Sequence, residues 1–406
     1  MPSYDAIVVG ARCAGSALAL LLARRGRRVL VVDRAQFPSD TVSTHFLWPR
    51  STAFLHAWGL LDRLAATGCP PIERVSMFWG PVAVAGRPEP VDGVSAMFCP
   101  RRTVLDALLV EAAREAGAEV REQTTVVDLL FEGGRVTGIR ARDAGGRLYE
   151  ERATIVVGAD GSFSRVARAA GATFLRSHPA LTCGYYAYWS DVPVDGVEFY
   201  IREGRDVLVF PTHDGQTCVW VGRSSDEWPD YRANVEARYL GGLDDATRAR
   251  LDAGRRMSPF RGTHKLPNHF RRCHGEGWAL VGDAAYHRDP LTGMGIGDAF
   301  LGAELLARAL DTGLADKLSE ALADYERTLA EKTSAAFDYT LQAASLKDPA
   351  ALVPLYARIA SRPELTQQLM NVLAGSAPAR SLFNARNVAS LMRGGDLQMP
   401  AVALRQ

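Results

Sequence analysis

A glycine-rich turn near the start of the chain is the first feature whose residues could do recognisable chemistry. Gly10-x-Arg12-x-x-Gly15 follows a β-branched run and opens an Ala/Leu-rich segment, and Asp33 stands at the end of the next β-branched run. Glycines permit a tight turn, a helix N-terminus attracts phosphate, and a carboxylate at this distance can accept ribose hydroxyls. The pattern therefore indicates a dinucleotide site, although Arg12 stands where a second glycine is expected. The alternative is an ordinary buried βαβ unit.

Four later motifs fit the same interpretation. Arg102-x-x-Leu105-Asp106 begins a predicted helix, and Asp160-Gly161-x-x-Ser164 follows a buried strand. Gly282-Asp283 follows another strand, and Pro290-Leu-Thr-Gly-Met-Gly-Ile296 comes shortly after it. Any one of these is equally well explained as a strand-to-helix turn with a capping Asp. Their occurrence together, in this order after the glycine-rich turn, is much more specific.

The elements that must position these motifs follow from periodicity. Short apolar runs predict buried parallel strands before the glycine-rich turn and before Asp33, Asp160 and Asp283, and helical spacing predicts a helix over Arg102–Ala116. The segment 181–223 differs, because four aromatic and β-branched runs separated by turn signals predict an antiparallel sheet. Residues 224–260 and about 297–393 are helical in pattern.

With these motifs in this order, the sequence resembles the FAD-dependent monooxygenase superfamily with the para-hydroxybenzoate hydroxylase fold. That group includes geranylgeranyl reductases and flavin-dependent halogenases. The resemblance covers roughly residues 4–310 and is specific for fold and cofactor, but weak for the reaction. It implies an α/β fold with a Rossmann-type FAD-binding domain, an inserted antiparallel-sheet substrate domain and a helical C-terminal tail.

The resemblance also implies boundaries and cofactor-binding residues. We expect a discontinuous FAD-binding domain at 1–75, 99–175 and 265–335, a substrate domain at 76–98 and 176–264, and a helical region at 336–406. The turn would bind the FAD pyrophosphate, Asp33 the adenosine ribose, Asp283 the ribityl chain, and the last motif would flank the isoalloxazine ring. The residues expected to bind FAD are Gly10, Ala11, Ala14, Gly15, Asp33, Arg34, Arg102, Val126, Asp160, Asp283, Pro290, Gly293, Gly295 and Ile296.

Three functions stay open. The first is a monooxygenase that hydroxylates or epoxidises a small or medium organic molecule through a flavin C4a-hydroperoxide, as in secondary-metabolite tailoring. The second is a C=C reductase of the geranylgeranyl reductase type, which the stretch Pro290–Ile296 favours. The third is a non-catalytic binding protein on the same fold. Halogenation is disfavoured, because the halogenase segment W-x-W-x-I-P is replaced by Asp206-Val-Leu-Val-Phe-Pro and no lysine precedes Lys265.

Electrons would come from NAD(P)H, bound transiently by this chain or used by a separate flavin reductase, because only one nucleotide fingerprint is present. The partners would be an organic substrate and O2. His45 matches a loop that approaches the flavin in relatives, and its ordinary pKa suits proton transfer; the alternative is a loop histidine that bonds only to backbone. The expected pocket residues are His45, Tyr186, Tyr188, Phe210 and Trp220.

The amino-acid composition limits the classes of protein to which this chain can belong. The 406 residues carry 47 basic and 46 acidic side chains, for a net charge of +1, which does not favour nucleic-acid binding. The six cysteines form no C-x-x-C pair, so neither a metal site nor a disulfide framework is indicated. The longest early apolar run, from Cys13 to Ala23, is far below the ~20 residues of a membrane span. We therefore expect a cytoplasmic protein without an integral membrane segment.

Overall fold

A computed structural model describes residues 3–314, 317–347 and 349–393 of the chain. Their contacts divide the chain into two compact units. The first unit takes its described residues from Met1–His45, Pro100–Ala180 and Leu266–Asp338, and the second from Phe46–Cys99, Leu181–Lys265 and Tyr339–Gln406. Residues 46–75 thus group with the second unit, whereas the sequence analysis placed them with the FAD-binding domain. The domain boundaries given there stay a prediction.

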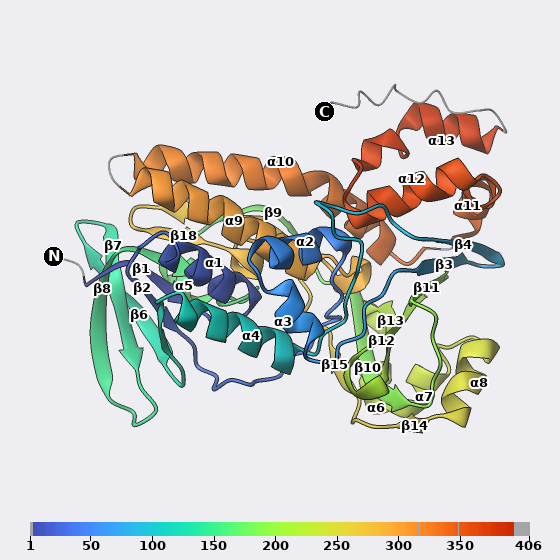
Figure 1. Cartoon of the computed structure of the whole chain (residues 1–406), viewed down its shortest axis with the longest axis horizontal. Helices are drawn as coiled ribbons and strands as arrows, with labels where there is room; N and C mark the ends of the chain where they lie inside the picture. Colours follow the sequence, from blue (N-terminus) through green and yellow to red (C-terminus); the bar gives the residue numbers. More distant parts are fainter. Residues whose placement is uncertain (1–2, 315–316, 348, 394–406) are drawn as a thin grey trace. The chain divides into compact units, whose positions relative to one another are not determined.

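The first unit is built on an eight-stranded sheet with the order β17-β18-β8-β1-β2-β5, while β6 and β7 pair off this path. Figure 1 labels β1, β2, β6, β7, β8 and β18 of this sheet. Its strands are β1 (Tyr4–Val9), β2 (Val29–Val32), β5 (Glu119–Arg121), β6 (Thr125–Glu132), β7 (Arg135–Arg142), β8 (Leu148–Gly158), β17 (His274–Gly275) and β18 (Trp278–Leu280). β1 pairs in parallel with β2 and β8, and β18 in parallel with β8. The parallel strands bring their carboxyl ends, and the motifs that follow them, to one edge of the sheet.

Helices and a small second sheet complete the first unit. Helix α1, which is buried along its whole length, contacts α4 and α9. The helices are α1 (Cys13–Ala23), α4 (Arg102–Glu115), α5 (Arg165–Ala169), α9 (Gly295–Gly313) and the first part of α10 (Leu318–Ala344). Two 3-10 turns, η3 (Gly282–Ala284) and η4 (Pro290–Thr292), lie between β18 and α9. The small sheet has the order β19-β16-β9, with β9 (Phe174–His178), β16 (Asn268–Arg271) and β19 (Tyr286–His287).

The second unit contains another eight-stranded sheet, with the order β14-β10-β13-β12-β11-β3-β4 and β15 paired to β10. Its strands are β3 (Val75–Trp79), β4 (Val82–Gly86), β10 (Thr182–Ser190), β11 (Val197–Arg202), β12 (Arg205–Pro211), β13 (Thr217–Ser224), β14 (Arg255–Arg256) and β15 (Arg261–Thr263). β10, β13, β12 and β11 pair antiparallel in that order, as predicted. β3, however, joins β11 in parallel, so the whole sheet is mixed.

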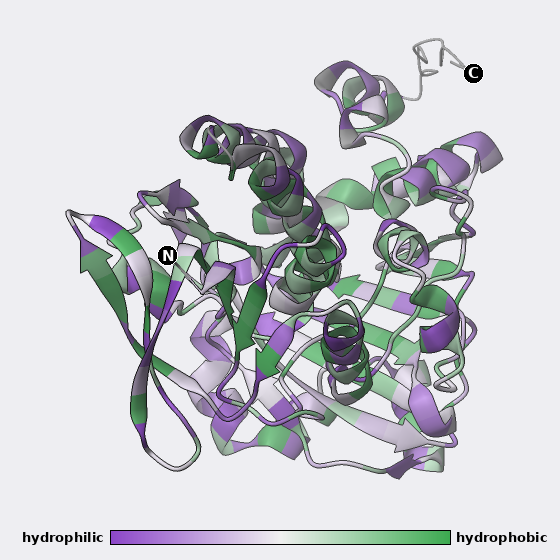
Figure 2. Ribbon diagram, turned by 60° about the vertical axis from the view of Figure 1, so that its left-hand side comes forward, coloured by the Kyte–Doolittle hydropathy of each residue, from purple (hydrophilic) through white to green (hydrophobic). Residues whose placement is uncertain are grey.

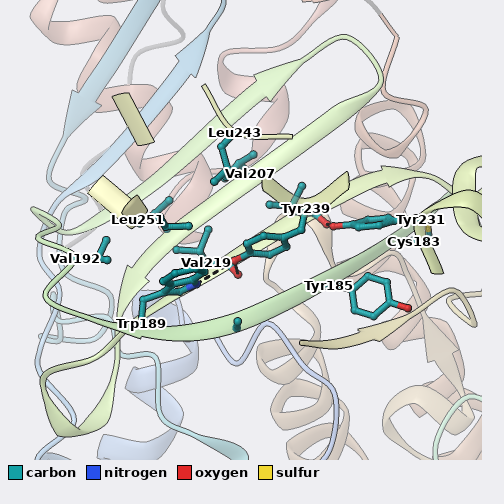
Figure 3. Close-up of a cluster of buried hydrophobic side chains, with 13 residues drawn as sticks. Cys183, Tyr185, Trp189, Val192, Val207, Val219, Tyr231, Tyr239, Leu243 and Leu251 are labelled. Carbon is teal, nitrogen blue, oxygen red and sulfur yellow. Dashed lines mark hydrogen bonds between the residues drawn. The ribbon is translucent and has the colours of Figure 1, made fainter. Parts of the chain in front are cut away.

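One face of this second sheet carries a helical layer. Alternate residues of β10, β12 and β13 pack against Tyr231, Tyr239, Leu243 and Leu251 from the segment that follows, and Figure 3 shows this cluster. The helices of the segment are α6 (Trp228–Ala233), α7 (Val235–Leu240) and α8 (Asp245–Ala253). Two buried tyrosine hydroxyls donate to strand carbonyls, from Tyr231 to Val221 and from Tyr239 to Val219, so these two hydroxyls are satisfied.

The remaining helices of the second unit are α2 (Pro49–Ala57), α3 (Leu61–Ala65), α11 (Val353–Ala360), α12 (Pro363–Ala374) and α13 (Ala385–Met392), with η1 (His213–Gly215), η2 (Ser225–Glu227), η5 (Pro349–Leu352) and η6 (Ala379–Ser381). Trp79 of β3 stacks on Tyr356 of α11, and Gly86 of β4 lies against Met370 of α12. The C-terminal helices therefore cover the β3–β4 end of the sheet.

The pattern of hydropathy follows these layers. Figure 2 shows hydrophobic strands and helices with both hydrophobic and hydrophilic residues, as expected for helices with one buried face. Among the described residues, no helix has the length and apolar character needed to cross a lipid bilayer. The α/β class, the presence of a second, separate sheet and the helical character of the C-terminal part are confirmed.

Candidate functional site

The glycine-rich turn joins β1 to α1 in a space that only glycine fits. Gly10 has a φ of +106°, and a Cβ there would lie 2.4 Å from the Ala159 carbonyl oxygen. A Cβ on Gly15 would lie 1.8 Å from the Gly10 carbonyl oxygen. Helix α1 starts directly after the turn, and no side chain of the described residues caps it. Its first N–H groups therefore suit an anionic ligand such as a pyrophosphate.

Arg12 occupies the second glycine position without obstructing the turn. Its guanidinium turns aside, ion-paired with Asp106 at 2.6 Å. The same group also donates to the carbonyl oxygens of Ser39 and Asp40 at 3.2 Å each. Arg12 thus links the turn to the 39–40 segment and to α4. This finding explains how the departure from the pattern is accommodated.

Asp106 is the centre of a buried charge cluster. Its side chain has no exposed surface, and it accepts hydrogen bonds from Arg12, from Arg102 one helical turn earlier, and from the Cys13 thiol. Burial lowers the pKa of Arg102, but Cys13, Asp106 and Asp283 together raise it above its ordinary value. Arg102 therefore stays charged, and Asp283 lies within reach of its field. The sequence analysis did not predict this ion pair, although the i, i+4 spacing of Arg102 and Asp106 on a helix could have indicated it.

Asp33, which directly follows β2, accepts a hydrogen bond from the glycine-rich turn. One carboxylate oxygen accepts from the backbone N–H of Ala11 and the other from that of Ala35, both at 2.7 Å. A carboxylate oxygen has two lone pairs, so each can accept one further hydroxyl. Arg34, which follows, is exposed, and Val126 lies buried on β6.

Asp160 has a structural task. Its carboxylate accepts from the Ser164 hydroxyl and from the backbone N–H groups of Arg165 and Val166, which caps the start of α5. The preceding residue, Ala159, donates its N–H to the Val9 carbonyl and lies against Gly10. Asp160 therefore holds the 159–164 segment in place beside the turn.

Asp283 lies on η3 at the same end of the sheet. Gly282 has a φ of +62°, and a Cβ there would come 2.6 Å from the Cβ of Ala14, so the Gly282-Asp283 turn packs on the start of α1. The Asp283 side chain is exposed, and none of the described residues donates a hydrogen bond to its carboxylate. The N–H of Ala285 bonds instead to the Gly282 carbonyl, so Asp283 is not a helix cap.

The last motif forms a turn and the start of α9. Asp289 accepts from the Leu291 N–H and caps η4, and Gly293 follows with a φ of +63°. A Cβ on Gly295 would meet no atom within 4 Å, so there is open space at the first turn of α9. Ile296 is buried one residue on, while Pro290 is partly buried on η4.

His45 is buried, with a positive φ of 39°. Its Nδ1 lies 2.8 Å from the Ser43 carbonyl oxygen, so the histidine makes the backbone contact that was its structural alternative. The catalytic role stays a prediction. Among the described residues, no group of three or more histidine, cysteine or acidic side chains could hold a metal ion.

The expected pocket residues of the second unit share one face of its sheet. Tyr186 pairs with Trp220, and Cys218 pairs with both Tyr188 and Phe210, so all four side chains lie opposite the face that packs on α6–α8. All four are buried. Tyr185 and Trp189, in contrast, belong to the core on the other face.

Sequence reasoning missed the polar feature of this face. The Trp220 indole N–H donates to the buried Asp206 carboxylate at 3.1 Å. The ring lies over Gly184, where a Cβ would come 2.3 Å from it. Because the antiparallel register sets this contact, only the pairing of three strands reveals it.

The comparisons with known proteins agree with this geometry. A family model described as an FAD binding domain matches residues 3–338. A digeranylgeranylglycerophospholipid reductase of Methanosarcina mazei is 30% identical over 312 residues, which is 75% of this chain and 74% of the reductase. The myxobacterial chondrochloren halogenase CndH superposes with a TM-score of 0.78 at 23% identity, covering 95% of this chain and 98% of the halogenase. PqsL of Pseudomonas aeruginosa, described as a probable FAD-dependent monooxygenase, gives 0.69 at 21% identity, covering 92% and 100%.

Proposed function

The chain belongs to the FAD-binding domain family and is an FAD-dependent oxidoreductase; from this premise we propose that it is a monooxygenase of a small or medium organic molecule. Hydroxylation and epoxidation are both within this proposal, with O2 as co-substrate. The observation that carries it is the buried aromatic face formed by Tyr186, Tyr188, Phe210 and Trp220, which suits an apolar organic substrate and excludes water.

The residues of the first unit fit the FAD that the family implies. Glycine is required at positions 10 and 15, and the uncapped start of α1 would bind the pyrophosphate. The Asp33 carboxylate would accept the adenosine ribose hydroxyls, and the Asp283 carboxylate the ribityl hydroxyls. Arg102 would lie against the FAD chain and Val126 near the adenine, and the open first turn of α9 would flank the isoalloxazine ring. Bound FAD would supply the redox chemistry and the activation of O2.

The chain's own residues would then bind, orient and exclude water. The aromatic face would hold the substrate, with Asp206 keeping the Trp220 ring flat on the sheet. His45 would move a proton at its imidazole. NAD(P)H would be the electron source, either bound transiently by this chain or used by a separate flavin reductase. A cytoplasmic location would supply NAD(P)H and such a reductase.

A C=C reductase is the second candidate. The identity to the Methanosarcina mazei digeranylgeranylglycerophospholipid reductase favours it, together with the Pro290–Ile296 motif. The same buried aromatic face would accommodate an isoprenoid chain. The structures that resemble this chain at under 25% identity show the fold alone.

Oxygen dependence separates the two candidates. FAD-loaded protein, reduced with dithionite, would be mixed with a panel of aromatic and alkene compounds and with a digeranylgeranylglycerophospholipid, under 18O2 or under argon. The monooxygenase proposal expects one labelled oxygen atom in the product and no turnover under argon. A product that gains two hydrogen atoms under argon would instead establish the reductase.

A further inference from the structure

Strand β16 carries three buried polar side chains that no motif predicted. Asn268, His269 and Arg271 are all buried, within a strand of only four residues. Burying polar groups is costly unless they are hydrogen-bonded, so the partners of these side chains indicate their purpose. All three bond to the turns that carry the expected FAD residues.

Arg271 joins two of these turns. Its Nη1 donates to the Ala284 carbonyl at 2.8 Å, next to Asp283, and its Nη2 donates to the Ser162 carbonyl at 2.9 Å, two residues from Asp160. Its backbone N–H also donates to the Ala285 carbonyl at 2.8 Å. The planar guanidinium is thus a rigid spacer between the 160–162 turn and the Asp283 turn.

The environment of Arg271 is unusual for a buried cation. Within the part of the chain that the structure describes, no carboxylate lies within ion-pair distance of it. The ring of Phe174 covers the guanidinium at 4.6 Å. Because the guanidinium makes no ion pair with the described residues, its role must lie in the geometry of its two hydrogen bonds to the Ser162 and Ala284 carbonyls.

His269 and Asn268 support the same region. The Nε2 of His269 lies 3.0 Å from the Asp283 carbonyl oxygen. A carbonyl only accepts, so Nε2 carries the proton. Asn268 accepts from the backbone N–H of Asp289 at 2.7 Å, at the start of the Pro290 motif. One short strand therefore contacts all three turns.

We propose that Arg271 is a positioning residue for FAD, which sets the spacing of the 160–162 and Asp283 turns and so aims the Asp283 carboxylate at the cofactor. His269 would hold the same turn through its contact with the Asp283 carbonyl. This inference rests on the assignment of Asp283 to FAD, and it holds for either reaction of the proposed function.

The test compares Arg271→Lys and Arg271→Gln with Arg272→Gln, which removes a neighbouring arginine that pairs with Glu326 at the surface. The dissociation constant of FAD would be measured by titration of the apoprotein, with visible-region circular dichroism of the bound flavin and far-ultraviolet circular dichroism of the chain. We expect at least tenfold weaker binding for Arg271→Gln, about threefold to tenfold weaker binding for Arg271→Lys with an altered visible spectrum, and a change of less than twofold for Arg272→Gln. Arg271→Lys keeps the charge, so it remains informative if Arg271→Gln does not fold.

A double variant tests whether Arg271 acts through Asp283. In the Asp283→Ala background, Arg271→Lys should weaken FAD binding by less than twofold, because the carboxylate it aims is already gone. Wild-type affinity and spectrum in Arg271→Lys, or full additivity in the double variant, would overturn the proposal. Normal FAD binding by Asp283→Ala alone would instead show that the assignment of Asp283 is wrong.

Discussion

Three carboxylates follow strands of the first sheet, and each is used differently. Asp33 accepts backbone N–H groups from the glycine-rich turn, and Asp160 caps α5. Asp283 alone keeps its full hydrogen-bonding capacity, because none of the described residues donates to its carboxylate. Residues of one type at similar places in the sequence therefore differ in what they can offer a ligand.

Asp283→Ala should abolish most FAD retention and leave the apoprotein folded. The carboxylate is exposed and accepts no hydrogen bond from the described residues, so the loss of its field on Arg102 should change the free energy of unfolding by less than about 0.5 kcal/mol. The ratio of flavin to protein absorbance after gel filtration measures the first effect, and urea unfolding of the apoprotein the second. Asp311→Ala, which removes a surface partner of Arg27, is the matched control and should retain flavin. Full occupancy in Asp283→Ala would refute the assignment.

Asp106→Asn should destabilise the protein by about 3 kcal/mol, since losing one partner of a buried ion pair costs ~3–5 kcal/mol. The low end applies because Arg12 is 29% exposed and water would relieve its charge. Urea unfolding at pH 7 gives the value. Asp252→Asn breaks an exposed pair with Arg248 and should cost less than about 0.5 kcal/mol. An equal loss of unfolding free energy in the two variants would show that burial does not make the Asp106 ion pairs more important for stability than an exposed pair.

At the scale of elements, helix α1 fits against the glycine-rich turn only because position 15 carries no side chain. The Gly15 backbone lies against Gly10, and Ala14 lies against Gly282. Helix α1 thus touches two of the expected FAD turns, and a shift of its first turn would disturb both.

Gly15→Ala should therefore weaken FAD binding at least tenfold and destabilise the apoprotein by about 1–3 kcal/mol, as overpacking does. Its new Cβ would meet backbone, which cannot give way as a flexible side chain can. Gly145→Ala, in a surface turn where the added Cβ would have an ordinary contact at 3.4 Å, is the control. Flavin titration and urea unfolding measure both variants. Unchanged affinity in Gly15→Ala would mean that α1 does not contact the cofactor.

Strand β16 gives the fold a pH dependence through His269. Burial, and then the charges of Arg271 and His287, lower the pKa of His269 to about 3 in the folded chain. The unfolded chain binds this proton near pH 6.5, so the stabilising contribution is present above pH 6.5 and is lost as the pH falls from 6.5 toward 3. The contribution of His269 to the free energy of unfolding falls by at most about 1.4 kcal/mol per pH unit.

The difference in unfolding free energy between wild type and His269→Gln isolates this contribution, because the other titrating groups are common to both. As the pH falls from 6.5 to 4.5, the wild type should lose stability relative to His269→Gln. Urea unfolding of both apoproteins measures this change. His56→Gln, at an exposed position of α2, should follow the wild type. A pH-independent difference for His269→Gln would contradict the buried neutral imidazole.

At the scale of the whole molecule, local pattern and long-range pairing contribute differently to what the sequence predicts. The βαβ unit, Asp33 and the Gly282-Asp283 turn were predictable because short runs of apolar residues and glycines determine strands and turns locally. The destination of the Arg12 side chain was not, because it depends on Asp106, far away in sequence and brought close by helix packing. The parallel pairing of β3 with β11 and the tasks of β16 likewise depend on contacts between distant segments.

All six cysteines lie in the described part of the chain, where each is buried and none forms a disulfide. Burial raises the pKa of Cys69 to about 12 and holds the pKa of Cys13, Cys99 and Cys273 well above the ordinary value. Thiolates are the reactive form, so the native thiols should be inert toward maleimides. The wild-type chain is thus a ready background for fluorescence labelling: one cysteine introduced on the surface of each unit would take a donor and an acceptor dye, and energy transfer would report any movement when FAD binds.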